Sequence, residues 1–131
     1  MKRFILVIIP FIFILFSCEK EVGEGGTSTI SGRVLVKNYN SDFSVKLGEY
    51  YAPGIDVFII YGDEQIYSDK FETGIDGWYR FEYLTKGDYT VYTLSADSTR
   101  QSQSGIMIIE KKVSITENNQ SIVVDDLVIF D

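Results

Sequence analysis

The sequence predicts an all-β fold, a seven-stranded β-sandwich of Greek-key type, from three observations. From Thr29 onward, β-branched and aromatic residues alternate with polar ones in short runs, which is the period of a half-buried strand. No long segment keeps the 3.6-residue apolar period of an amphipathic helix. Glycine, aspartate and asparagine separate the runs at close spacing, as turns separate the strands of a sandwich.

The alternating runs place the strands in order along the chain. They are expected at about residues 30–37, 55–61, 65–72, 78–84, 88–95, 106–116 and 121–130. Short connections with glycine or asparagine between two runs are expected to be hairpin loops, because these residues accept positive φ. The expected loops are residues 62–64, 74–77, 86–88 and 117–120. The strands on either side of residues 86–88 would then form a central hairpin.

Two connections are longer than a hairpin loop. Residues 38–54 contain Phe43, Val45, Leu47, Tyr50 and Tyr51, too many apolar side chains for a free loop, and are expected to form either an extra edge strand or a flap laid on the sheet. Residues 96–105 are mostly polar and are expected to be exposed.

The N-terminus has the pattern of an export signal. Lys2 and Arg3 precede an apolar run of 13 residues, whereas a helix needs about 20 to cross a bilayer, so the run fits a signal-peptide core. The sequence LFSC that ends at Cys18 resembles the lipobox of bacterial lipoproteins. This resemblance implies that Cys18 is lipidated, becomes the first residue of the mature chain and anchors it to a membrane.

The chain is therefore expected to have three parts. Residues 1–18 are the lipoprotein signal peptide, residues 19–28 a flexible tether, and residues 29–131 the β-sandwich domain. The tether is charged and glycine-rich, a composition that buries little apolar surface. Acidic residues just after Cys18 also resemble the surface-export signals of Bacteroidetes-type lipoproteins. The expected location is the outer membrane, on the cell surface or the periplasmic face.

Composition excludes several classes of function. The chain has 19 acidic and 12 basic residues and a net charge of −7, and removal of Lys2 and Arg3 with the signal peptide makes it −9. So acidic a chain is not expected to bind nucleic acid, which requires basic residues against the phosphates. The chain has no histidine, the commonest general base and metal ligand. Its acidic groups lack the spacing of a calcium loop. We therefore expect no enzymatic activity, no metal site and no cofactor.

A family resemblance follows from the motifs of the opening and central strands. They are Ser31-Gly32-Arg33-Val34, Pro53-Gly54-Ile55-Asp56-Val57 and Thr73 with Asp76-Gly77-Trp78-Tyr79-Arg80-Phe81, followed by Leu84, Gly87, Asp88, Tyr89 and Val91. This pattern resembles transthyretin-like domains, which include carboxypeptidase regulatory-like modules and are related to adhesin B-type repeats. The resemblance implies a sandwich with an accessory role. The hydrolases of this fold use histidines and a C-terminal Tyr-Arg-Gly-Ser motif, whereas this chain ends in LVIFD.

Alternation also assigns the core of the central strands. Tyr79 and Phe81 share one face of their strand, and Tyr89 and Val91 share one face of the next, so these four side chains are expected to point inward. Leu84 is out of parity with Phe81, so a bulge or the strand end must turn it inward.

The remaining aromatic residues are the candidates for ligand binding. Trp78 and Tyr92 are expected side by side on the opposite face of the central hairpin, and Tyr61 and Tyr67 flank the turn at residues 62–64. An exposed aromatic platform suits stacking on a sugar ring or anchoring a protein. The alternative is that residues 38–54 cover this face and bury Trp78.

Two functions are compatible with these observations. The first is a non-enzymatic cell-envelope lipoprotein whose sandwich is a binding or structural module, for adhesion or for support of an envelope protein complex. The second is a small glycan-binding lipoprotein of a nutrient-uptake system.

Overall fold

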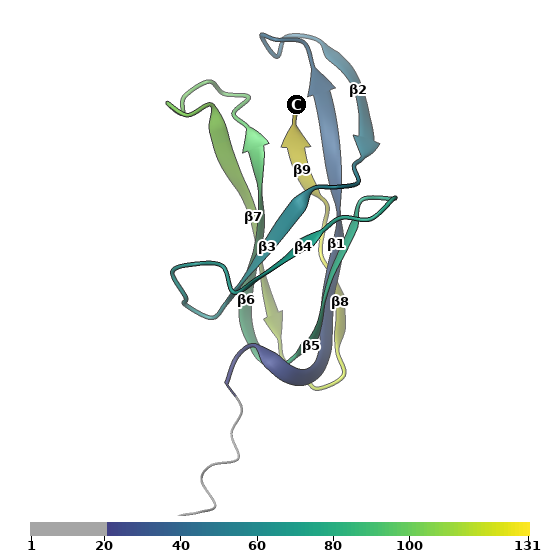
Figure 1. The fold of residues 1–131 in the computed structure, drawn as a ribbon, viewed down its shortest axis with the longest axis vertical. Coiled ribbons are helices and arrows are strands. Elements are labelled where there is room, and N and C mark those ends of the chain that lie inside the picture. Colours follow the sequence, from purple (N-terminus) through teal and green to yellow (C-terminus); the bar gives the residue numbers. More distant parts are fainter. Residues whose placement is uncertain (1–20) are drawn as a thin grey trace, which may run out of the picture.

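A computed structural model describes residues 21–131, and every regular element in this range is a β-strand. The strands are β1 (Glu24–Tyr39), β2 (Lys46–Tyr51), β3 (Asp56–Tyr61), β4 (Asp69–Glu72), β5 (Trp78–Leu84), β6 (Gly87–Ala96), β7 (Ile106–Ile115), β8 (Ser121–Val123) and β9 (Leu127–Phe130). They form two sheets (Figure 1), which confirms the predicted all-β sandwich. Nine strands replace the expected seven, because residues 38–54 contribute β2 and the last expected strand is divided into β8 and β9.

The first sheet is built around β1. This strand pairs antiparallel with β5 and β2 and parallel with β8 and β9. Val34 marks the change of partner along one edge of β1: its N–H donates to Gly77 O at the start of β5, and its carbonyl accepts from Ala52 N just after β2. The segment 38–54 thus provides an extra edge strand, the first of the two expected alternatives.

The second sheet has the order β4-β3-β6-β7, with antiparallel pairing throughout. The hairpin between β3 and β4 is as predicted, but β4 begins only at Asp69, and residues 62–68 form its loop. The two central strands are longer, and the ladder between β6 and β7 runs from Gly87 and Ile115 to Ala96 and Ile106. This ladder makes β7 the long outer edge of the sheet.

The expected central hairpin is wrong, because β5 and β6 belong to different sheets. Tyr83 has a φ of 60°, which turns Leu84 inward at the end of β5, as its parity required. Thr85 then donates its N–H to Gly23 O on the incoming chain. The chain therefore crosses from one sheet to the other at residues 85–86, and it crosses again at residues 74–77 and 117–120, which were also expected to be hairpin loops.

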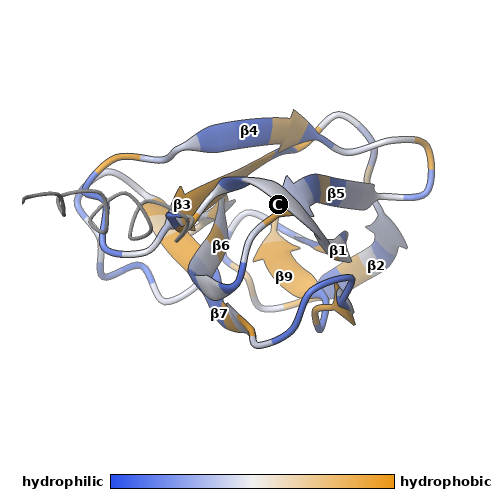
Figure 2. Cartoon of the chain, turned by 90° about the horizontal axis from the view of Figure 1, so that it is seen from below, coloured by the Kyte–Doolittle hydropathy of each residue, from blue (hydrophilic) through white to orange (hydrophobic). Residues whose placement is uncertain are grey.

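The core lies between the two sheets, and alternation predicted its central residues correctly. Tyr79, Phe81, Tyr89 and Val91 are all buried, and each large side chain contributes about 1.5–3 kcal/mol on burial. Gly32 of β1 is required opposite Tyr79, because a Cβ there would lie 2.5 Å from the tyrosine Oη. Hydrophobic residues gather on β3 and β9, whereas most of β4 is hydrophilic (Figure 2).

The N-terminal boundary of the domain differs from the expectation. β1 begins at Glu24, inside the segment expected to be a tether, and residues before it are bound to the corner between β5 and β6. Thr85 Oγ1 donates to Glu21 O at 2.7 Å, and the Gly23 N–H lies 3.0 Å from both Thr85 Oγ1 and Tyr89 Oη. Tyr89 Oη donates to Thr85 O at 2.7 Å, the geometry of a tyrosine corner. We call this set of contacts the N-terminal clamp.

Residues 1–20, which include the signal-peptide core and Cys18, lie outside the described part of the chain. Within residues 21–131 no helix is long and apolar enough to span a membrane.

We predict that Tyr89→Phe lowers the free energy of unfolding by about 1–3 kcal/mol, because it removes a buried hydroxyl from the N-terminal clamp and leaves Thr85 O without that donor. The measurement is urea unfolding. Tyr92→Phe is the matched control, since the Tyr92 hydroxyl makes no hydrogen bond within residues 21–131, and its change should stay within about 0.5 kcal/mol. Equal losses in the two variants would contradict the prediction.

Candidate functional site

The four predicted ligand-binding residues do not form one site. Trp78 lies on β5 of the first sheet, whereas Tyr92 lies on β6 of the second. The expected contact between them is wrong, because β5 and β6 are not paired. Trp78 is 41% exposed, so residues 38–54 do not bury it.

Tyr92 and Tyr67 belong to an aromatic row on the second sheet, joined by Phe58. The Phe58 ring stacks on Tyr92 with centroids 5.0 Å apart and an interplanar angle of 21°, and it lies 4.8 Å from Tyr67. The register places Leu94 opposite Ile108 farther along the same face. We call this surface the apolar stripe; it consists of Phe58, Tyr67, Tyr92, Leu94, Ile106 and Ile108, of which the last three are exposed and were not predicted.

Tyr61 is partly a structural residue. Its ring packs edge-on against Tyr89 with centroids 5.8 Å apart. Burial, together with the nearby charges of Glu24 and Asp69, raises the pKa of Tyr61 to about 12, so its hydroxyl is protonated at neutral pH. Tyr61 and Tyr67 both line a hollow of about 500 Å³ beside the loop of residues 62–68.

Trp78 takes part in a second cluster, on the outer face of the first sheet. Alternation along β1 buries Val34 and so turns Arg33 outward, and the register places Arg33 opposite Trp78. The guanidinium carbon of Arg33 lies 4.9 Å from the centre of the Trp78 ring and 4.0 Å from the centre of the Tyr51 ring. Both distances are within the range of cation–π attraction, which holds the guanidinium over the two rings.

Asp126 completes this cluster and orients the tyrosine. Tyr51 Oη donates to Asp126 Oδ2 at 2.9 Å. Tyr51 ends β2, and Asp126 lies between β8 and β9, which pair with the other edge of β1, so the tyrosine side chain reaches across β1. We call Arg33, Tyr51, Trp78 and Asp126 the aromatic–arginine site. Only Trp78 among them was predicted as a ligand-binding residue.

The polar atoms of the site are incompletely paired. Arg33 Nε is buried without a hydrogen-bond partner, and the guanidinium forms no ion pair or hydrogen bond within residues 21–131. Asp126 Oδ1 likewise makes no hydrogen bond to the described residues, so it is a free acceptor. On the inner face of the same sheet, burial raises the pKa of Tyr79, and the charge of Asp126 adds a smaller effect in the same direction, so the Tyr79 hydroxyl stays protonated. The site therefore presents donors and an acceptor beside two exposed rings.

The turn before Trp78 builds the site. Gly77 has a φ of 77°, and a Cβ there would lie 3.0 Å from both Tyr51 Cβ and Val34 O. Thr73 Oγ1 donates to Ala52 O at 2.7 Å and accepts from Ile55 N at 2.9 Å. The segment from Thr73 to Gly77 thus fixes both the start of β5 and the chain just after Tyr51, and thereby brings the two rings together.

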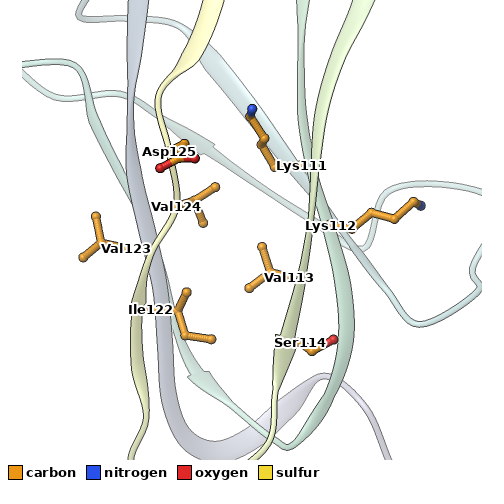
Figure 3. Close-up of a pocket in the computed structure, with 8 residues that line it drawn as sticks. All are labelled: Lys111, Lys112, Val113, Ser114, Ile122, Val123, Val124 and Asp125. Atoms are coloured by element: carbon orange, nitrogen blue, oxygen red, sulfur yellow. The ribbon is translucent and has the colours of Figure 1, made fainter.

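Two other hollows are open to solvent. One of about 340 Å³ lies between β7 and β8, where Val113, Ile122 and Val124 form its apolar wall (Figure 3). Another of about 260 Å³ is lined by Tyr39, Phe43, Ser98 and Phe130. No group of three or more cysteine, aspartate or glutamate side chains in residues 21–131 is placed to hold a metal ion.

Comparisons with known proteins give little further information. No family model matches the sequence, and no curated protein matches it. A solved structure from Pseudomonas aeruginosa, described as a "putative carbohydrate binding protein", superposes with a TM-score of 0.48 at 12% identity, over 91% of this chain and 99% of that one.

We predict that Gly77→Ala destabilises the domain by about 1–3 kcal/mol, because alanine disfavours positive φ and its Cβ would press against Tyr51. Urea unfolding measures the loss, and a shifted Trp78 emission in the folded state would report the displaced ring. Gly48→Ala on β2 is the matched control, since no atom of the described residues lies within 4 Å of its added Cβ. Stability and emission unchanged in both variants would argue against this role of Gly77.

Proposed function

We propose that the protein is a non-enzymatic, lipid-anchored lipoprotein of the cell envelope, and that its sandwich is a binding module that holds a saccharide at the aromatic–arginine site. The observation that supports a saccharide ligand is the pair of exposed rings, Trp78 and Tyr51. They lie beside polar atoms of Arg33 and Asp126 that have no partner within residues 21–131. The anchor rests on the lipobox that ends at Cys18.

The chemistry of a sugar ring matches this arrangement. The carbon–hydrogen face of a pyranose is apolar and packs on an aromatic face, while its hydroxyls need donors and acceptors at the rim. The Arg33 guanidinium lies over both rings, and Trp78 and Tyr51 remain 41% and 37% exposed, so the aromatic surface for a sugar is the part that the guanidinium leaves open. Within the described part of the chain, Arg33 has donors without partners, and Asp126 Oδ1 is an acceptor without one. Because all but Asp126 lie on paired strands, the site is already formed before binding, which lowers the entropic cost of binding.

The N-terminal clamp limits how far the domain stands from the membrane. With Cys18 lipidated, only two residues separate it from Glu21, whose carbonyl is bound by Thr85. Three residue steps of extended chain span at most about 11 Å. The lower end of the domain in Figure 1, where the described chain begins, would then lie close to the lipid headgroups.

The remaining parts of the proposal rest on the sequence. The absence of histidine and of a nucleophile motif supports a non-enzymatic role. The motif spacing supports a relationship to transthyretin-like domains. Three residues of that motif have structural roles in this chain, which favours the relationship: Thr73 binds Ala52 O, Gly77 adopts a positive φ, and Tyr89 binds Thr85 O.

We predict that Cys18→Ala releases the protein from the membrane fraction, because the variant lacks the thiol that would carry the lipid. Fractionation of cells that produce each form measures the release. Protease treatment of intact cells then distinguishes the two faces of the outer membrane, since only a surface domain is cleaved before the membrane is opened. Unchanged fractionation of the variant would be incompatible with the anchor.

We predict that saccharide binding changes the fluorescence of Trp78, the only tryptophan of the chain. Titration of the wild-type domain across a glycan panel should give saturable changes, and Tyr51→Ala should weaken binding by about tenfold or more, since it removes one of the two rings. Tyr92→Ala is the control, because Tyr92 lies on the other sheet. Flat titrations across the panel would exclude this ligand class and favour support of a protein complex through the apolar stripe.

A further inference from the structure

We infer that the saccharide bound at the aromatic–arginine site is acidic, and that Arg33 binds its carboxylate. The ligand class is a sugar with a ring carboxylate, such as a uronic acid. This inference rests on the proposed function, since it assumes that a saccharide occupies the site.

The first argument is the unpaired state of the guanidinium. The chain has 19 acidic residues, yet no described carboxylate forms an ion pair with Arg33. Its Nε is buried without an acceptor among residues 21–131, and an unsatisfied buried donor is costly and rare enough in folded proteins to require an explanation. Arg80, which shares the outer face of β5 with Trp78, pairs with Glu82 at 3.3 Å, so an arginine on this face can find a carboxylate within the chain. A ligand that carries a negative charge would be the missing partner of the Arg33 guanidinium.

The second argument is the direction in which Arg33 can donate. A guanidinium offers a carboxylate two edges, one formed by the two terminal nitrogens and one formed by Nε and a terminal nitrogen. Because Nε is buried, only the terminal edge is accessible to a ligand. The contacts with Tyr51 and Trp78 hold the guanidinium in place, so this edge is prepared for a bidentate contact.

The two contacts are compatible with one ligand. A uronic acid carries its carboxylate on a ring carbon, next to the apolar face of the same ring. The guanidinium carbon lies 4.9 Å from the centre of the Trp78 ring. A sugar beside Trp78 would therefore bring its carboxylate within reach of Arg33, while Asp126 Oδ1 would accept from a hydroxyl.

The negative charge of the protein opposes this binding only in part. The net charge of −7 repels an anion at long range, but salt screens such forces beyond about 8 Å at physiological ionic strength. Asp126, the acid within the site, accepts a hydrogen bond from the Tyr51 hydroxyl through one of its oxygens, which stabilises the carboxylate without removing its charge. A direct contact with Arg33 acts within this screening distance, whereas the net charge does not, and no electrostatic acceleration of association is expected.

The test compares sugars that differ only in the carboxylate. The Trp78 fluorescence of the wild-type domain is titrated with galacturonate oligomers and with galactose oligomers of the same length and linkage. We expect the acidic series to bind about tenfold tighter or more. Arg33→Gln should lower the affinity for the acidic series to that for the neutral series. Arg33→Lys should restore only part of the preference, since an ammonium cannot make the bidentate contact.

Arg80→Gln is the control, because Arg80 is on the same strand face as Trp78 but is already paired with Glu82. This variant should keep the full preference for the acidic series. The comparison of the two sugar series on the unmodified domain needs no variant, so it holds even if an Arg33 variant fails to fold.

The outcomes distinguish failure of this inference from failure of the proposed function. Equal binding of the two series would overturn the inference and leave the saccharide proposal standing. A preference that persists in Arg33→Gln would show that another group binds the carboxylate, which also overturns the inference. Absence of binding by either series, together with a flat response to the wider panel, would overturn the proposed function and this inference with it.

Discussion

The register of β1 is the constraint on which both the core and the candidate site depend. This single strand pairs with β2, β5, β8 and β9, and its alternation sends Val34 inward and Arg33 outward. A shift by one residue would exchange the two faces. Gly32 prevents such a shift, because any other residue opposite Tyr79 would collide with the buried tyrosine ring. The pairing that closes the core is therefore the pairing that presents the arginine.

The candidate site is also a consequence of the way one edge of β1 is shared. β5 and β2 follow each other along this edge, and their junction is the turn that ends at Gly77. Trp78 and Tyr51 are neighbours only because two strands distant in sequence meet at this junction. The turn thus has a structural role and a functional consequence, and both would be affected by the same substitution.

Local pattern was sufficient for part of this architecture. Alternation assigned Tyr79 and Tyr89 to the core correctly, because successive side chains of a strand point to opposite faces of the sheet and only one face is buried. It could not tell a hairpin from a crossing between sheets, because both use glycine-containing turns; the crossing after β5 depends on Tyr83 at positive φ and on the contact of Thr85 with Gly23. Trp78 could be predicted from its parity. Its partnership with Arg33 and Tyr51 is non-local, and the only signal was the excess of apolar residues in segment 38–54.

The N-terminal clamp relates the proposed anchor to the proposed ligand. Glu21 and Gly23 are held at the corner between β5 and β6, at the end of the sandwich where the described chain begins (Figure 1). β1 runs along the long axis of the domain from this end (Figure 1). With this end at the membrane, the outer face of β1 would be roughly perpendicular to the membrane surface and would not be covered by it. A chain anchored at Cys18 would then leave Trp78 and Arg33 open to a saccharide that approaches along the membrane. A short anchor and an accessible site are therefore compatible in one geometry.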